Sequence, residues 1–351
     1  MKILTILGAR PQFIKAAVIS RYIRANTPSI QEEILHTGQH YDHGMSQVFF
    51  DEMDIPTPTI NLHIGSGTHG SATADMLKGI EAEIFSRKPD WVLVYGDTNS
   101  TLAGALAAVK CHVPVAHIEA GERSYNRQMP EEINRILTDH MSSVLFCCSK
   151  ASEQRLATEG ITKNVFHVGD VMCDAFLTYL PNAIWPKQLP HFSKPFALAT
   201  LHRAQNTDDP VRLTAIFSAL AALPEQIVLP IHPRTLKNVQ AHQITIGKNI
   251  HLLQPVSYFE MLGLLKECAY VLTDSGGLQK EAYYANKKCV ILREETEWVE
   301  LVDAGMNKIA GINTLKIIET AVWAKEAIHF PKHIYGDGNT AEKIINKIYK
   351  Q

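Results

Sequence analysis

Short apolar runs rich in Val, Ile and Leu recur along the chain, and a longer amphipathic stretch follows each of them. This alternation is typical of a doubly wound parallel sheet with helices on both faces. A polar stretch interrupted by prolines, from about Leu177 to Lys194, divides the runs into two sets. We therefore predict an α/β fold of two Rossmann-like domains, residues 1–176 and 177–335. The predicted strands are Lys2–Leu7, Glu33–His36, Trp91–Tyr95, Val115–Ile118, Val144–Cys147 and Val165–His167 in the first set, then Phe196–Thr200, Ile227–Ile231, Ile250–Leu253, Tyr270–Thr273 and Cys289–Leu292.

The C-terminal tail carries a further predicted helix. A turn cluster at 335–339 precedes an amphipathic segment for which Thr340 is the predicted N-cap. We expect this helix, about 336–351, to pack back onto the first domain. Ligands bind at the carboxyl ends of the strands in parallel α/β sheets. Two such domains facing each other predict a site in the cleft between them.

The composition narrows the class of ligand. The 351 residues are 46% hydrophobic and 20% charged, with a net charge of −2 and no run of Lys or Arg, which argues against nucleic acid as a partner. No stretch approaches the ~20 apolar residues of a membrane span, and the N-terminal apolar run is too short for a signal peptide. Six cysteines without a CxxC pair predict reduced thiols. We expect a cytoplasmic protein with a small ligand.

The segment Thr273–Ala282 combines a strand end, a Ser-Gly-Gly turn and the start of a helix. The backbone N–H groups of Ser275, Gly276 and Gly277 would face an anion at the helix N-terminus. Glu281, four residues after Gly277, would lie one turn further on the same face and could accept hydrogen bonds from ribose hydroxyls. The pattern predicts a binding site for a nucleotide diphosphate-sugar. The alternative is an ordinary strand-turn-helix junction.

The first predicted strand ends in Gly8-Ala-Arg-Pro11, with Arg10 and Lys15 near the start of the next helix. Positive charge at this place suits a phosphate, although a capped helix without a ligand explains the segment equally well. The stretch lacks GxGxxG spacing, so it gives no support to a nicotinamide or flavin cofactor.

Three acids stand at strand ends or helix starts of the first domain: Asp97, Glu119 and Glu131. Glu119 closes an apolar strand, where a charge has no packing purpose, and the three together indicate acid/base chemistry. Asp97 could instead cap the helix that begins near Ser100, and Glu131 or Glu132 could be a first-turn acid that stabilises a helix dipole.

Two strand ends of the second domain place His202, Arg203, His232 and Arg234 on a common edge. Cations there could hold a diphosphate, and His202 is the better candidate for stabilising a leaving phosphate. His232 precedes Pro233 and could be structural. No HExxH motif, Cys/His cluster or Asp-rich loop is present in the sequence, so we expect no bound metal.

Taken together, the motifs resemble the non-hydrolysing UDP-N-acetylglucosamine 2-epimerases. The resemblance covers nearly the whole chain in order. It implies a glycosyltransferase-B-like fold, a homodimer, a UDP-sugar held mainly by the second domain and no cofactor. The motifs that carry it are Gly8-Ala-Arg-Pro11, Thr37-Gly-Gln-His40, Gly96-Asp97-Thr98, His117-Ile-Glu-Ala-Gly121, Pro130-Glu-Glu132, His202-Arg203, His232-Pro233, Thr273 to Glu281 and Tyr335-Gly-Asp-Gly338.

The resemblance also implies a reaction and site roles. The family's isomerases invert C2 by anti elimination of UDP to 2-acetamidoglucal, followed by re-addition, for use in polysaccharide synthesis. By motif, Asp97, Glu119 and Glu131 would move protons or stabilise the intermediate, in an order that the sequence leaves open, and His202 would assist the departing UDP. Substrate contacts would come from Arg10, Ser275 and Gly276 at the phosphates, Glu281 at the ribose and Arg293 at the sugar.

The chain departs from the family pattern in two places. Regulated members carry an arginine after the motif ending in His40 as part of an activating UDP-N-acetylglucosamine site, whereas this chain has Tyr41-Asp42. Glu122 replaces a usual leucine, and it could pair with Arg123 or change the pocket wall.

Four alternatives to this interpretation remain open. The segment Glu295-Thr-Glu-Trp298 resembles the sequences of a sister group of epimerases that act on UDP-2,3-diacetamido-2,3-dideoxyglucuronate. A retaining glycosyltransferase would share the nucleotide grip but would not need the three acids. A noncatalytic nucleotide-sugar sensor would bind UDP without C2 exchange, and a hydrolytic relative would release UDP and free sugar.

Overall fold

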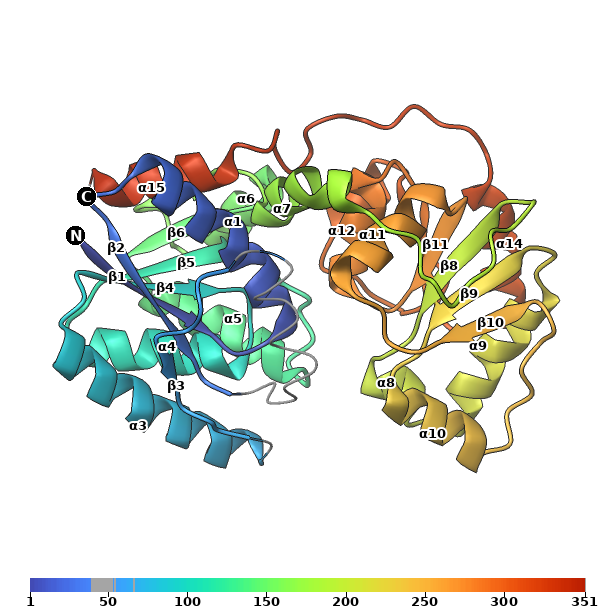
Figure 1. Cartoon of the computed structure of the whole chain (residues 1–351), viewed down its shortest axis with the longest axis horizontal. Coiled ribbons are helices and arrows are strands. Elements are labelled where there is room, and N and C mark those ends of the chain that lie inside the picture. Colours follow the sequence, from blue (N-terminus) through green and yellow to red (C-terminus); the bar gives the residue numbers. More distant parts are fainter. Residues whose placement is uncertain (39–52, 54, 66, 351) are drawn as a thin grey trace. The chain divides into compact units, whose positions relative to one another are not determined.

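The chain folds into two compact units, described by a computed structural model over residues 1–38, 53, 55–65 and 67–350 (Figure 1). One unit comprises Met1–Thr178 and His333–Gln351, and the other comprises Tyr179–Lys332. Each contains a parallel sheet covered by helices, so the predicted α/β class with two doubly wound sheets is confirmed.

The sheet of the first unit has seven strands in the order β3-β2-β1-β4-β5-β6-β7. The strand order reverses between β1 and β4, and the carboxyl ends beside such a switch point are where doubly wound sheets bind ligands. All six predicted strands of this unit are confirmed, and the sequence reading missed the two-residue β3. The strands are β1 Lys2–Leu7, β2 Gln31–His36, β3 Ile60–Asn61, β4 Trp91–Tyr95, β5 Val115–Ala120, β6 Val144–Cys147 and β7 Val165–His167.

Helices cover both faces of this sheet. Figure 1 shows α1 and α15 along one face and α3, α4 and α5 along the other. The prediction that Thr340 is the N-cap of the last helix is wrong, because Asn339 occupies that position and Thr340 is the first helical residue. The helices are α1 Arg10–Asn26, α3 His69–Arg87, α4 Asn99–Lys110, α5 Pro130–Met141, α6 Lys150–Thr158, α7 Val171–Tyr179 and α15 Thr340–Tyr349.

The second unit has a six-stranded parallel sheet in the order β10-β9-β8-β11-β12-β13. The five predicted strands are confirmed within one residue at each end, and the three-residue β13 was missed. The strands are β8 Phe196–Thr200, β9 Gln226–Pro230, β10 Ile250–Leu253, β11 Tyr270–Thr273, β12 Cys289–Ile291 and β13 Asn307–Ile309, and the helices are the short 3-10 turn Leu180–Asn182, α8 Ala204–Thr207, α9 Pro210–Ala222, α10 Pro233–Ala241, α11 Tyr258–Glu267, α12 Gly276–Tyr284, α13 Val299–Asp303 and α14 Thr314–Ala324.

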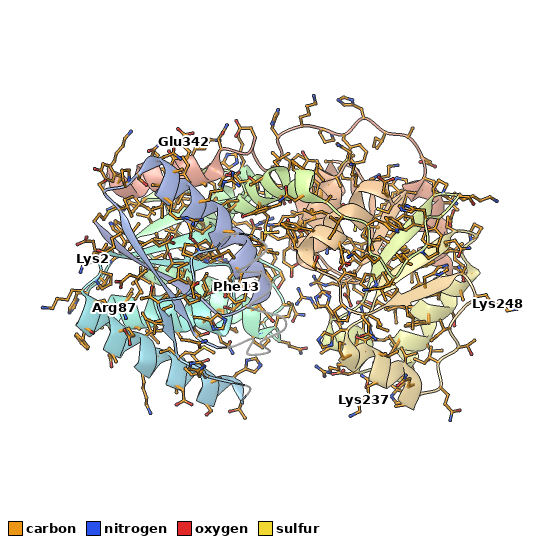
Figure 2. The ribbon with its side chains drawn as sticks, viewed as in Figure 1. Lys2, Phe13, Arg87, Lys237, Lys248 and Glu342 are labelled. Carbon is orange, nitrogen blue, oxygen red and sulfur yellow. The ribbon has the colours of Figure 1, made fainter. Side chains whose placement is uncertain are left out.

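Apolar burial stabilises each unit separately. In the first unit, Phe13 is fully buried and stacks on His36, with ring centroids 5.1 Å apart. Charged side chains such as Lys237 and Lys248 extend outward from the second unit (Figure 2). Helix α4 lies close to its sheet because Gly104 has no side chain; a Cβ there would come within 3.1 Å of Val94 Cγ1. Such close packing fixes the strand ends that carry the polar groups described next.

Candidate active site

Glu119 occupies an irregular position at the end of β5. The pairing of β5 with β6 shifts register between Ile118 and Ala120, so Glu119 is the extra residue of a bulge. Its φ of 74° lies in the left-handed region, which costs a residue with a side chain roughly 1–2 kcal/mol. Bulges redirect side chains, and strained backbone is concentrated at functional sites. The local geometry therefore indicates that Glu119 is held for a purpose other than packing.

The Glu119 carboxylate faces a buried ammonium group. Lys15 Nζ lies 2.7 Å from Glu119 Oε1, and the two side chains are only 7% and 12% exposed. Cys148 and Asp170 offer ligand-type atoms close to Glu119, all within 4.8 Å of one another. Lys15, which the sequence suggested for a phosphate, is thus an ion-pair partner of the proposed acid.

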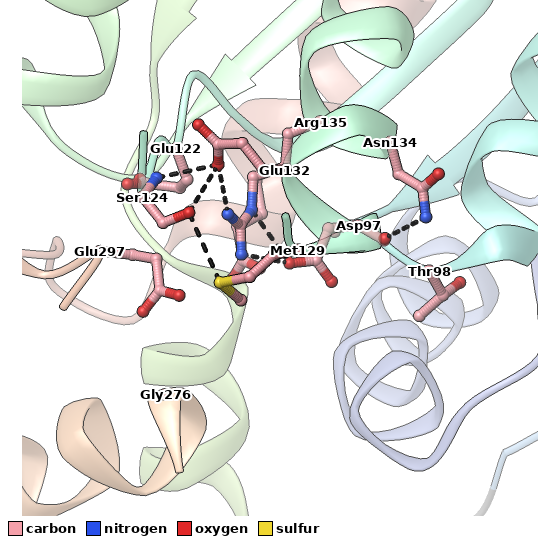
Figure 3. A network of polar contacts seen from close by, with 12 residues as sticks. Asp97, Thr98, Glu122, Ser124, Met129, Glu132, Asn134, Arg135, Gly276 and Glu297 are labelled. Atoms are coloured by element: carbon pink, nitrogen blue, oxygen red, sulfur yellow. Dashed lines mark hydrogen bonds and ion pairs between the residues drawn. The ribbon is translucent and has the colours of Figure 1, made fainter. Parts of the chain in front are cut away.

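Asp97, two residues after β4, is held by an arginine from helix α5. Arg135 Nη2 lies 2.7 Å from Asp97 Oδ2, and Arg135 Nε donates to the same oxygen at 3.0 Å (Figure 3). Asn134 Nδ2 donates to the Asp97 carbonyl at 2.9 Å. The alternative in which Asp97 caps the next helix is wrong, because the Thr98 side chain caps α4 by accepting from the Thr101 N–H.

Glu131 and Glu132 both lie in the first turn of α5, as the sequence suggested. Glu131 is half-buried, whereas Glu132 is buried and accepts from the N–H groups of Ser124 and Tyr125, each at 2.9 Å. Burial alone would raise the pKa of Glu132, but the Ser124 N–H and Arg135, at 2.7 Å, outweigh it and lower this pKa. Glu132 therefore fixes the loop before α5 as an ionised carboxylate.

A fully buried contact between His117 and Asp139 links the backbone segments next to these acids. His117 Nδ1 is 2.7 Å from Asp139 Oδ1, and His117 Nε2 is 2.8 Å from the Gly96 carbonyl. Asp139 Oδ2 accepts from the Gly121 N–H at 3.1 Å and lies 2.7 Å from Arg123 Nη1. Burial acts to raise the pKa of Asp139, but His117 and Arg123 outweigh it and lower this pKa. Sequence reasoning missed this pair, although a histidine inside an apolar strand was a signal for it.

The predicted side-chain pair between Glu122 and Arg123 does not form. Glu122 instead accepts from Arg155 Nη1 at 2.8 Å and from Ser152 Oγ at 2.6 Å. Arg123 binds Asp139 and Glu159 and donates only to the backbone carbonyl of Glu122, at 2.7 Å. Each of the two side chains therefore finds its partners on other segments of the chain.

In the second unit, the junction after β11 is built on Asp274. This buried carboxylate accepts from the backbone N–H groups of His202 and Arg203, each at 3.1 Å, and so ties the β8 strand end to the start of α12. The Ser275 N–H does not face outward as predicted, because it donates to Thr273 Oγ1 at 2.9 Å. Ser275 is the N-cap of α12, accepting from the Leu278 N–H.

The free end of α12 therefore begins at Gly276 and Gly277. The first N–H groups of a helix have no acceptor within that helix, and they favour an anion. Glu281 lies buried in the second turn of α12, and Trp298 Nε1 donates to the Gly276 carbonyl at 2.8 Å. Of the three predicted backbone donors, the structure rules out the Ser275 N–H, and those of Gly276 and Gly277 stay a prediction.

The cations near this edge differ in their surroundings. His202 is exposed, with Nδ1 3.5 Å from Asp274 Oδ1. His232 caps α10 by accepting from the Arg234 N–H at 3.2 Å, which is the structural role left open above, and Arg234 pairs with Asp208. Arg293 is buried and pairs with Glu297 at 3.0 Å.

Some predicted features lie outside the described residues. The Arg10 side chain, Gln39-His40 of one motif and the departure at Tyr41-Asp42 belong to this group.

Within the described ranges, no helix is long and apolar enough to cross a membrane.

Two doubly wound parallel-sheet units are the architecture of the glycosyltransferase-B-like class. A calicheamicin glycosyltransferase of 14% identity shares the fold, with a TM-score of 0.54 over 99% of this chain and 94% of that one. The family model for UDP-N-acetylglucosamine 2-epimerase matches residues 23–349. The chain belongs to this family of epimerases and is an isomerase.

Similar proteins include epimerases named for two different UDP-sugars. A UDP-N-acetylglucosamine 2-epimerase homolog of Methanococcus maripaludis is 48% identical, covering 98% of both chains. A UDP-2,3-diacetamido-2,3-dideoxy-D-glucuronate 2-epimerase of Pseudomonas aeruginosa is also 48% identical, covering 100% of both. The crystal structure of the Methanocaldococcus jannaschii UDP-GlcNAc 2-epimerase in complex with UDP-GlcNAc and UDP matches with a TM-score of 0.93, at 40% identity and 100% coverage of both chains.

Proposed function

We propose that this protein is a non-hydrolysing 2-epimerase that interconverts UDP-N-acetylglucosamine and UDP-N-acetylmannosamine. The observation that carries the proposal is the Glu119 carboxylate, which stands on a left-handed backbone position and is held by Lys15 at 2.7 Å. Two further candidate acids of the same unit, Asp97 and Glu131, follow a strand end and begin a helix. A sensor or a glycosyltransferase has no need for several ordered carboxylates in the domain that does not grip the nucleotide. The similarity to the M. jannaschii enzyme, solved with UDP-GlcNAc and UDP, supports the same substrate class.

The proposed reaction breaks two bonds and then remakes them. A carboxylate removes the C2 proton while the C1–O bond to UDP breaks, giving 2-acetamidoglucal and UDP. UDP then adds back to C1, and a proton is delivered to the opposite face of C2. The C2 proton is weakly acidic, so stabilisation of the departing diphosphate and exclusion of water contribute as much as the base.

The structure supports a division of roles between the units. Asp97, Glu119 and Glu131 move protons or stabilise the intermediate, and the Gly276 and Gly277 N–H groups with Arg10 hold the diphosphate. Exposed His202 assists the departure of UDP, and Glu281 binds the ribose. Buried Arg293 supports the sugar pocket through its pairs with Glu297 and Glu295. For Lys15 and His232 we propose indirect roles, because both are engaged by protein groups.

The second candidate substrate is UDP-2,3-diacetamido-2,3-dideoxyglucuronate. It is favoured by the 48% identity to the P. aeruginosa enzyme over the full length of both chains. Both substrates require the same C2 chemistry. We also propose a homodimer located in the cytoplasm, supplying a cell-surface polysaccharide.

Proton NMR of the purified protein with UDP-N-acetylglucosamine in deuterated water tests the proposal. We expect loss of the H2 signal, deuterium at C2 and appearance of UDP-N-acetylmannosamine, because the returning proton comes from solvent. Glu119→Gln should abolish the exchange. Exchange only with the diacetamido-uronate substrate would select the second candidate, and full turnover by the Gln variant would refute the assigned site.

A further inference from the structure

Helix α5 presents three polar residues on one face, at intervals of one turn. Glu131, Arg135 and Asp139 are each four residues apart, so their side chains follow one another along the helix. Glu131 is one of the three proposed acids, and Arg135 holds a second one, Asp97, at 2.7 Å. Asp139, the last of the three, is fully buried and has no role in the chemistry proposed above.

Asp139 connects the two strand ends that carry the other acids. Its Oδ2 accepts from the N–H of Gly121, two residues after Glu119, at 3.1 Å. Its Oδ1 binds His117 Nδ1 at 2.7 Å, and His117 Nε2 reaches the carbonyl of Gly96, directly before Asp97, at 2.8 Å. One carboxylate and one imidazole thus span the end of β4, the end of β5 and helix α5.

The hydrogen-bond partners define the protonation state of His117. A backbone carbonyl only accepts, so Nε2 must donate to Gly96. Asp139 Oδ2 already receives the Gly121 N–H and the Arg123 guanidinium, which is the surrounding of an ionised carboxylate, so Nδ1 must donate as well. Both ring nitrogens therefore carry a proton. The charges of His117 and Arg123 are balanced by Asp139 and Glu159, which lies 2.8 Å from Arg123.

We propose that His117 and Asp139 form a charged positioning pair, which fixes the spacing between the Asp97 turn and the Glu119 bulge. The inference rests on the proposed function for the roles of those two acids. Neither residue touches the substrate in this proposal. Their effect is geometric, because displacement of a reacting group by 1 Å lowers a rate by about 100-fold.

The protonation state is tested without substrate. Proton–nitrogen NMR of the whole protein at pH 7.5 should show His117 with two protonated ring nitrogens, and the signal should be identified by its loss in His117→Gln. A single protonated nitrogen on His117 would overturn the charged pair. This spectrum is independent of turnover, so it stands even if the proposed reaction proves wrong.

Kinetics test the positioning role. Asp139→Asn keeps the size of the side chain but removes the charge, and we expect kcat to fall about 100-fold with KM within about threefold. Glu159→Gln is the matched control, since it removes the other partner of Arg123 and leaves both strand ends anchored; its kcat should stay within about threefold of wild type.

If Asp139→Asn does not fold, His117→Gln is measured in the same way, because it removes the link from Asp139 to Gly96 and leaves the contact of Asp139 with Gly121 in place. UDP affinity and melting temperature are recorded for every variant. A kcat within threefold of wild type in the folded Asp139 or His117 variant would overturn the proposal. A loss of kcat in the Glu159 variant equal to that in the Asp139 variant would also overturn the proposal.

Discussion

At the scale of single residues, the sequence indicated candidate acids but not the groups that hold them. Asp97 and Glu119 stand out in the sequence because a charge at the end of an apolar strand has no packing role. Lys15, however, is 104 positions from Glu119, and Arg135 is 38 positions from Asp97. Pairings across such separations depend on sheet order, which residue patterns do not encode. The bulge at Glu119 was unpredictable for the same reason, since it exists only relative to β6.

The positive φ of Glu119 predicts an unusual order of stability among substitutions. Glu119→Gly and Glu119→Ala both remove the carboxylate, so their difference reports on the backbone alone. Glycine relieves the strain of the left-handed backbone, but it also has greater conformational freedom in the unfolded chain, which opposes this gain. On balance, the Gly variant should be more stable than the Ala variant by about 0.5–1 kcal/mol. Urea denaturation of both variants measures this difference.

The control for that comparison is Glu131, in the first turn of α5. There the backbone is helical, so Glu131→Ala should be more stable than Glu131→Gly, by up to about 1 kcal/mol. The same sign at both positions would show that Glu119 is not strained.

At the scale of elements, apolar runs located the strands of the described residues except β3 and β13. β3 has two residues and β13 has three, and each pairs with one neighbouring strand, β2 or β12, that supplies its hydrogen bonds. The α12 junction was found from its glycines, but the direction of the Ser275 N–H was not, because it depends on the Thr273 hydroxyl. Capping contacts between distant elements were equally hidden, as in the contact between α7 and α15.

Asp174 in α7 accepts from the Ala341 N–H at the start of α15, at 2.8 Å. Burial raises the pKa of Asp174 to about 6, even though the Ala341 N–H favours the charged form. In the unfolded chain an aspartate titrates near pH 4. Between these values the folded protein keeps a proton that the unfolded chain has lost, so this residue lowers stability as pH rises from about 4 to 6.

Asp174→Asn should therefore stabilise the protein at pH 7 by on the order of 2 kcal/mol, because asparagine can still accept from Ala341 without a buried charge. The gain should vanish at pH 4. Urea denaturation at both pH values measures it. Asp337→Asn, an exposed change shortly before Ala341, serves as the control and should show no such gain. A gain for Asp174→Asn that is equal at both pH values would contradict the mechanism.

At the scale of the whole molecule, the chain begins and ends in the same unit. The first unit needs His333–Gln351 to be complete, whereas Tyr179–Lys332 carries its own sheet and core. Helix α15 packs against α1 and buries Ala341, Ile344, Ile345 and Ile348. The Asp170 N–H also donates to the Tyr335 carbonyl, at 2.8 Å.

Removal of residues 333–351 should consequently unfold the first unit and spare the second. Each fully buried isoleucine contributes roughly 1.5–3 kcal/mol to the free energy of unfolding. The loss of three therefore removes a large part of the 5–15 kcal/mol that stabilises a typical domain. Hydrogen exchange followed by mass spectrometry should show rapid exchange in β1 and β2 of the truncated chain. The amides of β8 and β11 should stay protected, because their ladder lies wholly within Tyr179–Lys332. Deletion of residues 350–351 alone leaves the buried face of α15 intact and should change neither unit. Protection of β1 that survives the longer truncation would mean that the C-terminal helix only covers the first unit, and loss of protection in β8 would mean that the two units fold as one.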